Sequence, residues 1–149
     1  MIKVGDQAPT FSVPNQDGKN VTLSDYAGQY VLIWWYPKAD TPGWTTEGNG
    51  FRDRIQEFVN KNAVVLGCSM DGPGDNKAFK EKFNFPYDLL SDMEKTMSTA
   101  YGAARMDSAR PNRVSVLIAP DGKVAAVYPK VTPADHPNEV LTTLDNLSP

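Results

Sequence analysis

The strongest constraint on the fold is an apolar run at 30–36 that leads directly into a helix start. The run is rich in β-branched and aromatic residues without polar alternation, which predicts a strand buried on both faces. Pro37 ends that strand because proline has no N–H for a sheet ladder. Thr41 then suits a helix N-cap, and Pro42 suits the first helical position. A helix N-terminus beyond a buried strand attracts anions or an ionised nucleophile, yet the residue presented there is Trp44, which cannot be a nucleophile.

The residues after Pro42 predict a βαβ unit. We expect a helix of about 14–16 residues, near the usual length of helices in globular proteins. Glycines in its first turns indicate either fraying or a segment able to unwind, and we favour fraying. The apolar run at 63–69 predicts a second buried strand, joined to the first by a right-handed crossover. The expected apolar stripe of the helix consists of Phe51, Ile55, Phe58 and Val59.

Turn residues predict a β-hairpin near each end of the chain. Asp17 and Gly18 separate two short β patterns, and a Pro-Asp-Gly-Lys turn at 120–123 separates two longer apolar runs. The paired runs lie at 11–13 with 21–23, and at 113–118 with 124–128. Together with the βαβ unit, these hairpins predict one α/β domain over residues 1–149, with a central mixed sheet flanked by helices.

Two further helices follow from capping and spacing. Asp92 is expected to cap one of them, and Pro137 fits the first turn of the other, for which His136 or Asp135 is the candidate cap. We therefore interpret His136 as a cap rather than a general base, and expect no serine–histidine–acid set. The expected inward residues are Met93 and Met97 in the first helix, and Val140, Leu141, Leu144 and Leu147 in the second.

Composition and charge exclude several classes of function. A formal net charge of -3 gives no electrostatic basis for binding nucleic acid or an anionic membrane. No apolar run is long enough to span a membrane, and the first residues lack a signal-peptide layout, so we expect a cytoplasmic protein. One cysteine and one histidine exclude an internal disulfide and a Cys/His zinc site within one chain. We expect neither a cofactor nor a metal.

The only cysteine, Cys68, lies inside the second apolar run. It is either a small buried hydrophobe or a displaced nucleophile. A reactive thiol needs exposure and a positive neighbourhood, and the flanking residues supply neither. The buried, inert interpretation is therefore favoured.

The segment 36–47 resembles the active-site segment of the peroxiredoxins, most closely the bacterioferritin comigratory protein or peroxiredoxin Q group. It reads Tyr-Pro-Lys-Ala-Asp-Thr-Pro-Gly-Trp-Thr-Thr-Glu, where that group has roughly Tyr-Pro-Lys-Ala-x-Thr-Pro-Gly-Cys-Thr-x-Glu. The likeness extends from about Gly5 to Leu147, with further matches at the Leu-Leu-Ser-Asp and Ala-Tyr-Gly segments. It implies a three-layer, thioredoxin-like fold with an added N-terminal hairpin.

The resemblance also implies roles for particular residues. Thr41 and Arg113 would hold a peroxidatic thiolate and its peroxide, Pro37 would shield the pocket, and Glu47 would give polar support. The two cysteine positions hold Trp44 at the peroxidatic site and Asn49 at the resolving site, five residues later. Because neither residue carries a thiol, the usual chemistry of the family lacks its nucleophile.

We therefore expect a peroxiredoxin homologue that is inactive as a peroxidase, a pseudoenzyme acting as a binding or regulatory scaffold with an unknown protein partner. One alternative is an engineered variant of an active antioxidant peroxidase. The other is a peroxidase that uses Cys68, which its expected burial disfavours. An active oxidoreductase of this family would use a hydroperoxide and a thioredoxin-like reductant. The expected oligomeric state is a monomer or a weak homodimer.

Overall fold

The structure is a computed structural model that describes residues 2–39 and 42–147, without the side chains of Pro42 and Trp44. The strands are β1 (Ser12–Pro14), β2 (Asn20–Thr22), β3 (Tyr30–Trp35), β4 (Ala63–Ser69), β5 (Leu89–Ser91), β6 (Ser115–Ile118) and β7 (Val124–Tyr128). The helices are the 3-10 helix η1 (Leu23–Tyr26), α1 (Pro42–Asp53), α2 (Ile55–Asn60), α3 (Pro73–Phe83), α4 (Thr96–Ala100) and α5 (His136–Leu147).

The central sheet has five strands in the order β5-β4-β3-β6-β7. Strands β3, β4 and β5 run parallel, whereas β6 is antiparallel to β3 and β7 is antiparallel to β6. Strands β1 and β2 form a separate antiparallel hairpin. The predicted mixed sheet and N-terminal hairpin are therefore confirmed. The second strand pair also forms as predicted, although β6 begins at Ser115, two residues after its expected start.

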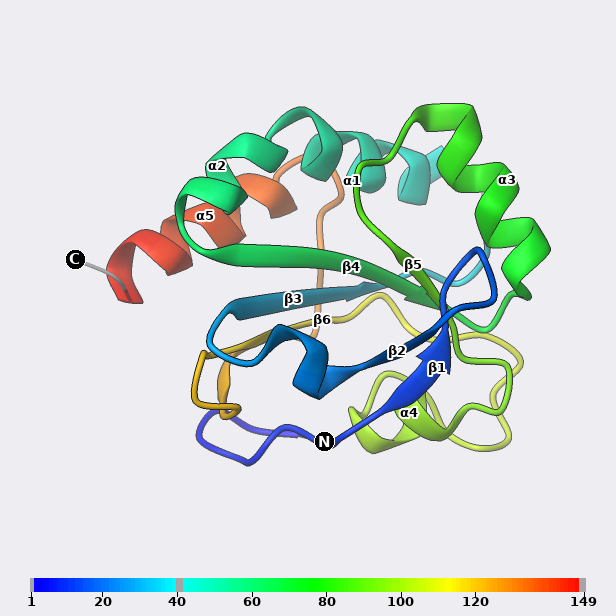
Figure 1. Ribbon diagram of the computed structural model, residues 1–149, viewed down its shortest axis with the longest axis horizontal. Coiled ribbons are helices and arrows are strands. Elements are labelled where there is room, and N and C mark those ends of the chain that lie inside the picture. The colour runs from blue at the N-terminus through cyan, green and yellow to red at the C-terminus, as the bar shows by residue number, and fades with distance from the viewer. Residues whose placement is uncertain (1, 40–41, 148–149) are drawn as a thin grey trace.

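Helices cover both faces of this sheet. The larger helices α1, α2, α3 and α5 lie on one face, and η1, the β1–β2 hairpin and α4 lie on the other (Figure 1). Alternate residues of β3 supply the two hydrophobic clusters, because successive side chains of a strand point to opposite faces. Val31, Ile33 and Trp35 enter the cluster on the α4 side, and Leu32 and Trp34 enter the cluster on the α1 side. The predicted two-sided burial of this strand is confirmed.

The predicted long helix is broken into α1 and α2. The break lies at Arg54, whose backbone dihedrals of φ -115° and ψ 16° leave the helical region. Because the helix is interrupted at Arg54, Val59 does not lie on the same face as Phe51 and does not continue the predicted apolar stripe. Its side chain is 58% exposed, so its expected inward position was wrong.

The glycines of α1 have a packing role that neither sequence interpretation included. A Cβ atom at Gly48 would lie 2.6 Å from Cζ of Phe85, and one at Gly50 would lie 2.8 Å from Cγ of Pro137. Real Cβ contacts are not this short, so α1 approaches α5 and the segment before β5 only because side chains are missing there.

Two other predicted inward residues are exposed. Met93 precedes α4, which begins at Thr96 rather than directly after Asp92, and Leu147 lies at the very end of α5. The capping role of Asp92 holds in a modified form, because its carboxylate accepts the backbone N–H of Ser98 at 2.6 Å. Among the described residues, no helix is long and apolar enough to cross a membrane.

Candidate functional site

The candidate site lies where β3 leads into α1. After β3, the backbone N–H of Tyr36 still bonds to the carbonyl of Cys68 at 3.1 Å, and the half-buried Pro37 then turns the chain away. Trp44 is the third residue of α1, but its side chain lies outside the described part of the structure, as does the whole of Thr41. The roles expected for these two residues therefore stay predictions.

Arg113 reaches this helix start from a distant part of the chain. It lies in the loop before β6, where Nη1 donates a hydrogen bond to the carbonyl of Val131 at 3.1 Å. Its Nη2 lies 3.2 Å from the point where a Cβ of Gly43 would stand. The guanidinium group thus lies against the first turn of α1, the terminus where the helix dipole is already positive.

Glu47 lies one helical turn beyond Gly43, on the same face of α1. Its side chain is 1% exposed, and neither carboxyl oxygen has a hydrogen-bond partner among the described residues. Burial raises the pKa of this carboxyl to about 8, and the nearby positive charge of Arg113 only partly opposes that rise. Glu47 is therefore mostly protonated and neutral at pH 7.

Asn49 and Cys68 lie away from this face of α1. Asn49 follows Glu47 by two positions, about 200° around a helix, and its Oδ1 atom also has no partner within the described chain. Cys68 belongs to the hydrophobic cluster on the opposite side of the sheet, with Sγ 4.0 Å from Sδ of Met97. Burial, followed by the charge of Asp92, raises the pKa of the Cys68 thiol well above its usual value. The predicted burial of Cys68 is confirmed.

The structure contains a serine–histidine–acid contact that the sequence reasoning did not expect. Nε2 of His136 lies 2.8 Å from Oγ of Ser115, and Nδ1 lies 2.9 Å from Oε1 of Glu139. Burial lowers the pKa of His136, partly opposed by its contact with Glu139. Ser115 is fully buried, so its hydroxyl is closed to a substrate, and the contact joins α5 to β6. The only sign of this contact in the sequence was the three-residue spacing of His136 and Glu139, which places them on one face of a helix.

No group of three or more histidine, cysteine, aspartate or glutamate side chains suited to a metal ion occurs among residues 2–39 and 42–147. The residues brought together at the helix start are instead an arginine, a neutral carboxyl group and backbone N–H groups. Such a set can donate hydrogen bonds to a negatively charged group, but it contains no nucleophilic sulfur.

Comparison with known proteins places this arrangement in a family. Residues 4–127 match the AhpC/TSA family. Peroxiredoxin Bcp of Escherichia coli strain K12 is 38% identical over 149 residues, covering 96% of this chain and 96% of that protein. The crystal structure of peroxidoxin BcpB from Mycobacterium tuberculosis superimposes with a TM-score of 0.92 at 30% identity, covering both chains completely.

A third relative is the bacterioferritin comigratory protein of Xanthomonas campestris, studied for its alkyl peroxide reduction activity. Its structure matches with a TM-score of 0.90 at 28% identity, covering 100% of this chain and 99% of that one. These likenesses confirm the thioredoxin-like fold and extend along nearly the whole sequence. The chain therefore belongs to the AhpC/TSA family and is a homologue of the Bcp and peroxiredoxin Q peroxiredoxins.

Proposed function

We propose that this chain has lost the thiol peroxidase chemistry of its family and serves as a binding or regulatory scaffold. The observation that carries the proposal is the position of Cys68, the only cysteine in the sequence. It is completely buried and lies across the sheet from α1 and Arg113. At the position where the family motif has its peroxidatic cysteine, this chain has Trp44.

Thiol peroxidase chemistry requires a thiolate, which attacks one oxygen of the peroxide and becomes a sulfenic acid. The O–O bond breaks, and the other oxygen leaves as hydroxide or alkoxide and takes up a proton. An ordinary cysteine has a pKa near about 8.5, so an enzyme must stabilise the anionic sulfur. Cys68 meets the opposite conditions, since burial raises its pKa and closes it to solvent. Arg113 and the helix N-terminus could stabilise a thiolate, but they cannot accept an oxygen atom.

Peroxide consumption by the purified protein tests this proposal. With hydrogen peroxide or an alkyl hydroperoxide, and dithiothreitol or a thioredoxin as reductant, we expect no rate above the buffer blank. The matched variant is Cys68→Ser, which should be indistinguishable from the unmodified chain. A rate that disappears in Cys68→Ser would establish Cys68 as a nucleophile and overturn the proposal.

The remaining parts of this proposal rest on the sequence and on the family likeness. We propose one domain over residues 1–149, cytoplasmic, and monomeric or weakly dimeric, with a protein as its partner. A hydroperoxide and a thioredoxin-like reductant would be the partners of this chain only if the assay showed turnover. The gene sequence distinguishes a natural loss of both cysteines from an engineered one.

A further inference from the structure

The chain holds sulfur in a second chemical form, the thioether of methionine. Of its five methionines, Met93 and Met106 are 52% and 62% exposed. Met97, in contrast, is 2% exposed and lies in the same hydrophobic cluster as Cys68. A thioether has no ionisable proton, so it can act as a nucleophile without a base or a lowered pKa. The two exposed methionines are therefore sulfur atoms that an oxidant in solution can reach.

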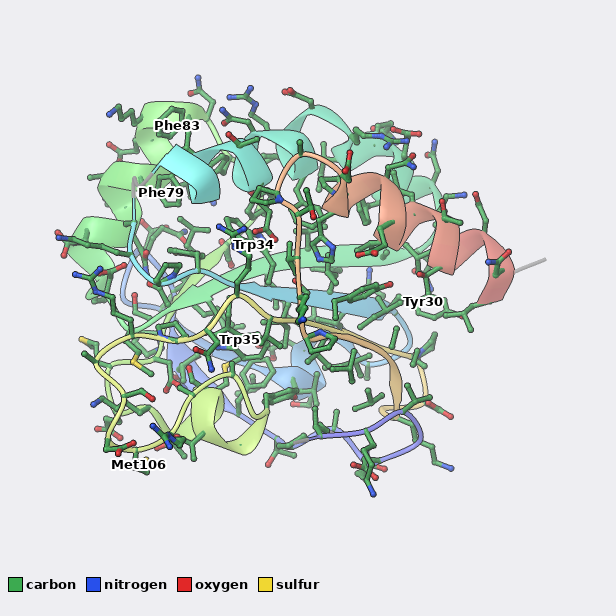
Figure 2. The ribbon with its side chains drawn as sticks, turned by 180° about the vertical axis from the view of Figure 1, so that it is seen from behind. Tyr30, Trp34, Trp35, Phe79, Phe83 and Met106 are labelled. Atoms are coloured by element: carbon green, nitrogen blue, oxygen red, sulfur yellow. The ribbon has the colours of Figure 1, made fainter. Side chains whose placement is uncertain are left out.

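Met106 lies on a hydrogen-bonded turn in the loop between α4 and β6. The backbone N–H of Arg105 donates to Oγ of Ser108 at 3.0 Å, and the N–H of Ser108 donates to the carbonyl of Arg105 at 2.9 Å. The turn carries Met106 to the periphery of the molecule, away from Trp34 and Trp35 (Figure 2). The exposure of Met106 is thus set by an ordered turn.

Two side chains at α4 contact Met106. The Thr99 hydroxyl donates to Sδ of Met106 at 3.3 Å, and Nζ of Lys95 donates to the Met106 carbonyl at 3.4 Å. Thr99 belongs to α4, and Lys95 directly precedes that helix. The Lys95 contact ties the turn to the helix through the backbone. The Thr99 contact places a hydroxyl donor beside the sulfur.

We propose that Met106 is an oxidation site, at which a hydroperoxide transfers one oxygen atom to Sδ and the Thr99 hydroxyl promotes the transfer. An S–O bond forms as the O–O bond breaks. The proton of the transferred oxygen moves to the leaving oxygen, which departs as water or an alcohol. The thioether is oxidised by two electrons to a sulfoxide, and the hydroperoxide is reduced by two.

The Thr99 hydroxyl favours this step because negative charge develops on oxygen. As the O–O bond breaks, charge appears on the leaving oxygen, and the transferred oxygen becomes the negative end of a polar S–O bond. A hydroxyl 3.3 Å from the sulfur can donate to these oxygens, whereas the thioether itself is a weak acceptor. A donor that binds the transition state more strongly than the starting thioether accelerates the reaction.

Met93 supplies an internal standard for this effect. It is exposed to nearly the same extent as Met106, so exposure alone predicts similar oxidation rates for the two. Its Sδ atom lies 3.8 Å from the point where a Cβ of Gly72 would stand, in a different loop. A faster reaction at Met106 therefore measures the contribution of the groups around its sulfur.

Treatment of the full-length protein with hydrogen peroxide, followed by peptide mapping with mass spectrometry, gives the oxidation rate of each methionine. We expect sulfoxide to form at Met106 about 3-fold faster than at Met93, which is the effect of one exposed hydrogen bond on a rate. Met97 should be oxidised only after the protein is unfolded in guanidinium chloride, because its sulfur is buried.

Two substitutions at Thr99 isolate the role of its hydroxyl. Thr99→Val keeps the branched shape but removes the donor, so Met106 should then react at the Met93 rate. Thr99→Ser keeps the hydroxyl and should retain the difference. In guanidinium chloride, both variants and the unmodified chain should give equal rates at Met93 and Met106. The ratio in the unmodified chain tests the proposal even if Thr99→Val does not fold.

Equal rates at Met93 and Met106 in the folded, unmodified chain would overturn the proposal, as would a difference that persists in Thr99→Val. The inference is independent of the proposed function, because each methionine takes up one oxygen atom and does not turn over. Peroxide turnover that depends on Cys68 would overturn the proposed function and leave the order of methionine oxidation unchanged.

Discussion

Two adjacent tryptophans show how differently the two faces of the central sheet are built. Trp35 points toward α4, where its Nε1 donates to Oγ of Ser98 at 3.0 Å, in the same cluster as Cys68. Trp34 points toward α1, where its Nε1 is buried without an acceptor among the described residues. The two aromatic side chains are equally buried, so hydrogen bonding distinguishes them and burial does not.

This difference separates a closed core from a region organised around polar groups. On the α4 side the only thiol of the chain is enclosed by apolar side chains and a satisfied tryptophan. On the α1 side, both carboxyl oxygens of Glu47 and Nε1 of Trp34 are buried without a partner among the described residues, near Arg113 and the helix N-terminus. Buried polar groups without partners call for an explanation, and a functional role for the α1 side remains a proposal.

The largest expected effect concerns access to the closed side. Because Cys68 is fully buried, the reagent DTNB should label it only when the protein unfolds. For a typical domain stability, native protein should react at least about 1,000-fold more slowly than protein in denaturant. Rapid native labelling would show that the α4 side opens, and the distinction between the two faces would fail.

The next largest effect concerns the pH dependence of stability on the α1 side. Since the pKa of Glu47 rises to about 8 in the folded protein, the folded state holds this proton more tightly than the unfolded state does. The resulting stability is fully present below the unfolded pKa, near about 4.3, and is lost as pH rises through 8. Urea unfolding between pH 5 and pH 8 should show a loss of about 3–4 kcal/mol that Glu47→Gln removes.

Glu57→Gln supplies the control for that measurement, because it changes a glutamate that is exposed on α2. It should leave the pH dependence of stability unchanged. Equal pH profiles for the unmodified chain and Glu47→Gln would mean that Glu47 is ionised in the folded state. The assignment of a neutral carboxyl group to Glu47 would then be wrong.

A smaller effect compares the two tryptophans themselves. Trp35→Phe removes the bond to Ser98 and leaves that buried hydroxyl without its partner. Trp34→Phe instead removes an N–H that has no acceptor within the part of the chain that the structure describes. Both changes remove a similar ring volume, so Trp35→Phe should destabilise the fold by about 1–2 kcal/mol more. Urea unfolding at pH 7 measures the difference. An equal or greater loss in Trp34→Phe would show that its N–H has a partner of its own.

The elements predicted well from sequence are those whose signal is local. The run at 30–36 and the run containing Cys68 are continuous and apolar, so their burial followed from side-chain pattern alone. The break at Arg54 was missed because neither glycine nor proline marks it, and the direction of the chain there is set by packing.

The contacts that define the site were harder to predict because they join distant segments. The approach of Arg113 to the start of α1 was expected only from the family likeness, which placed it beside position 44. Glu47 was interpreted as polar support, although the structure buries it as a neutral group. The contact of Ser115 with His136 was not expected from the sequence, because a serine within an apolar strand gives no sign of which helix will cover it.

The most direct test of the account introduces a thiol on the α1 side and compares it with Cys68 in the same molecule. In Trp44→Cys, Arg113 and the helix N-terminus should lower the pKa of the new thiol below its usual value, so that it reacts with hydrogen peroxide. Dimedone trapping followed by mass spectrometry identifies which cysteine becomes a sulfenic acid. We predict an adduct at position 44 and none at Cys68. A folded variant with an adduct at Cys68, or with none at position 44, would contradict the account.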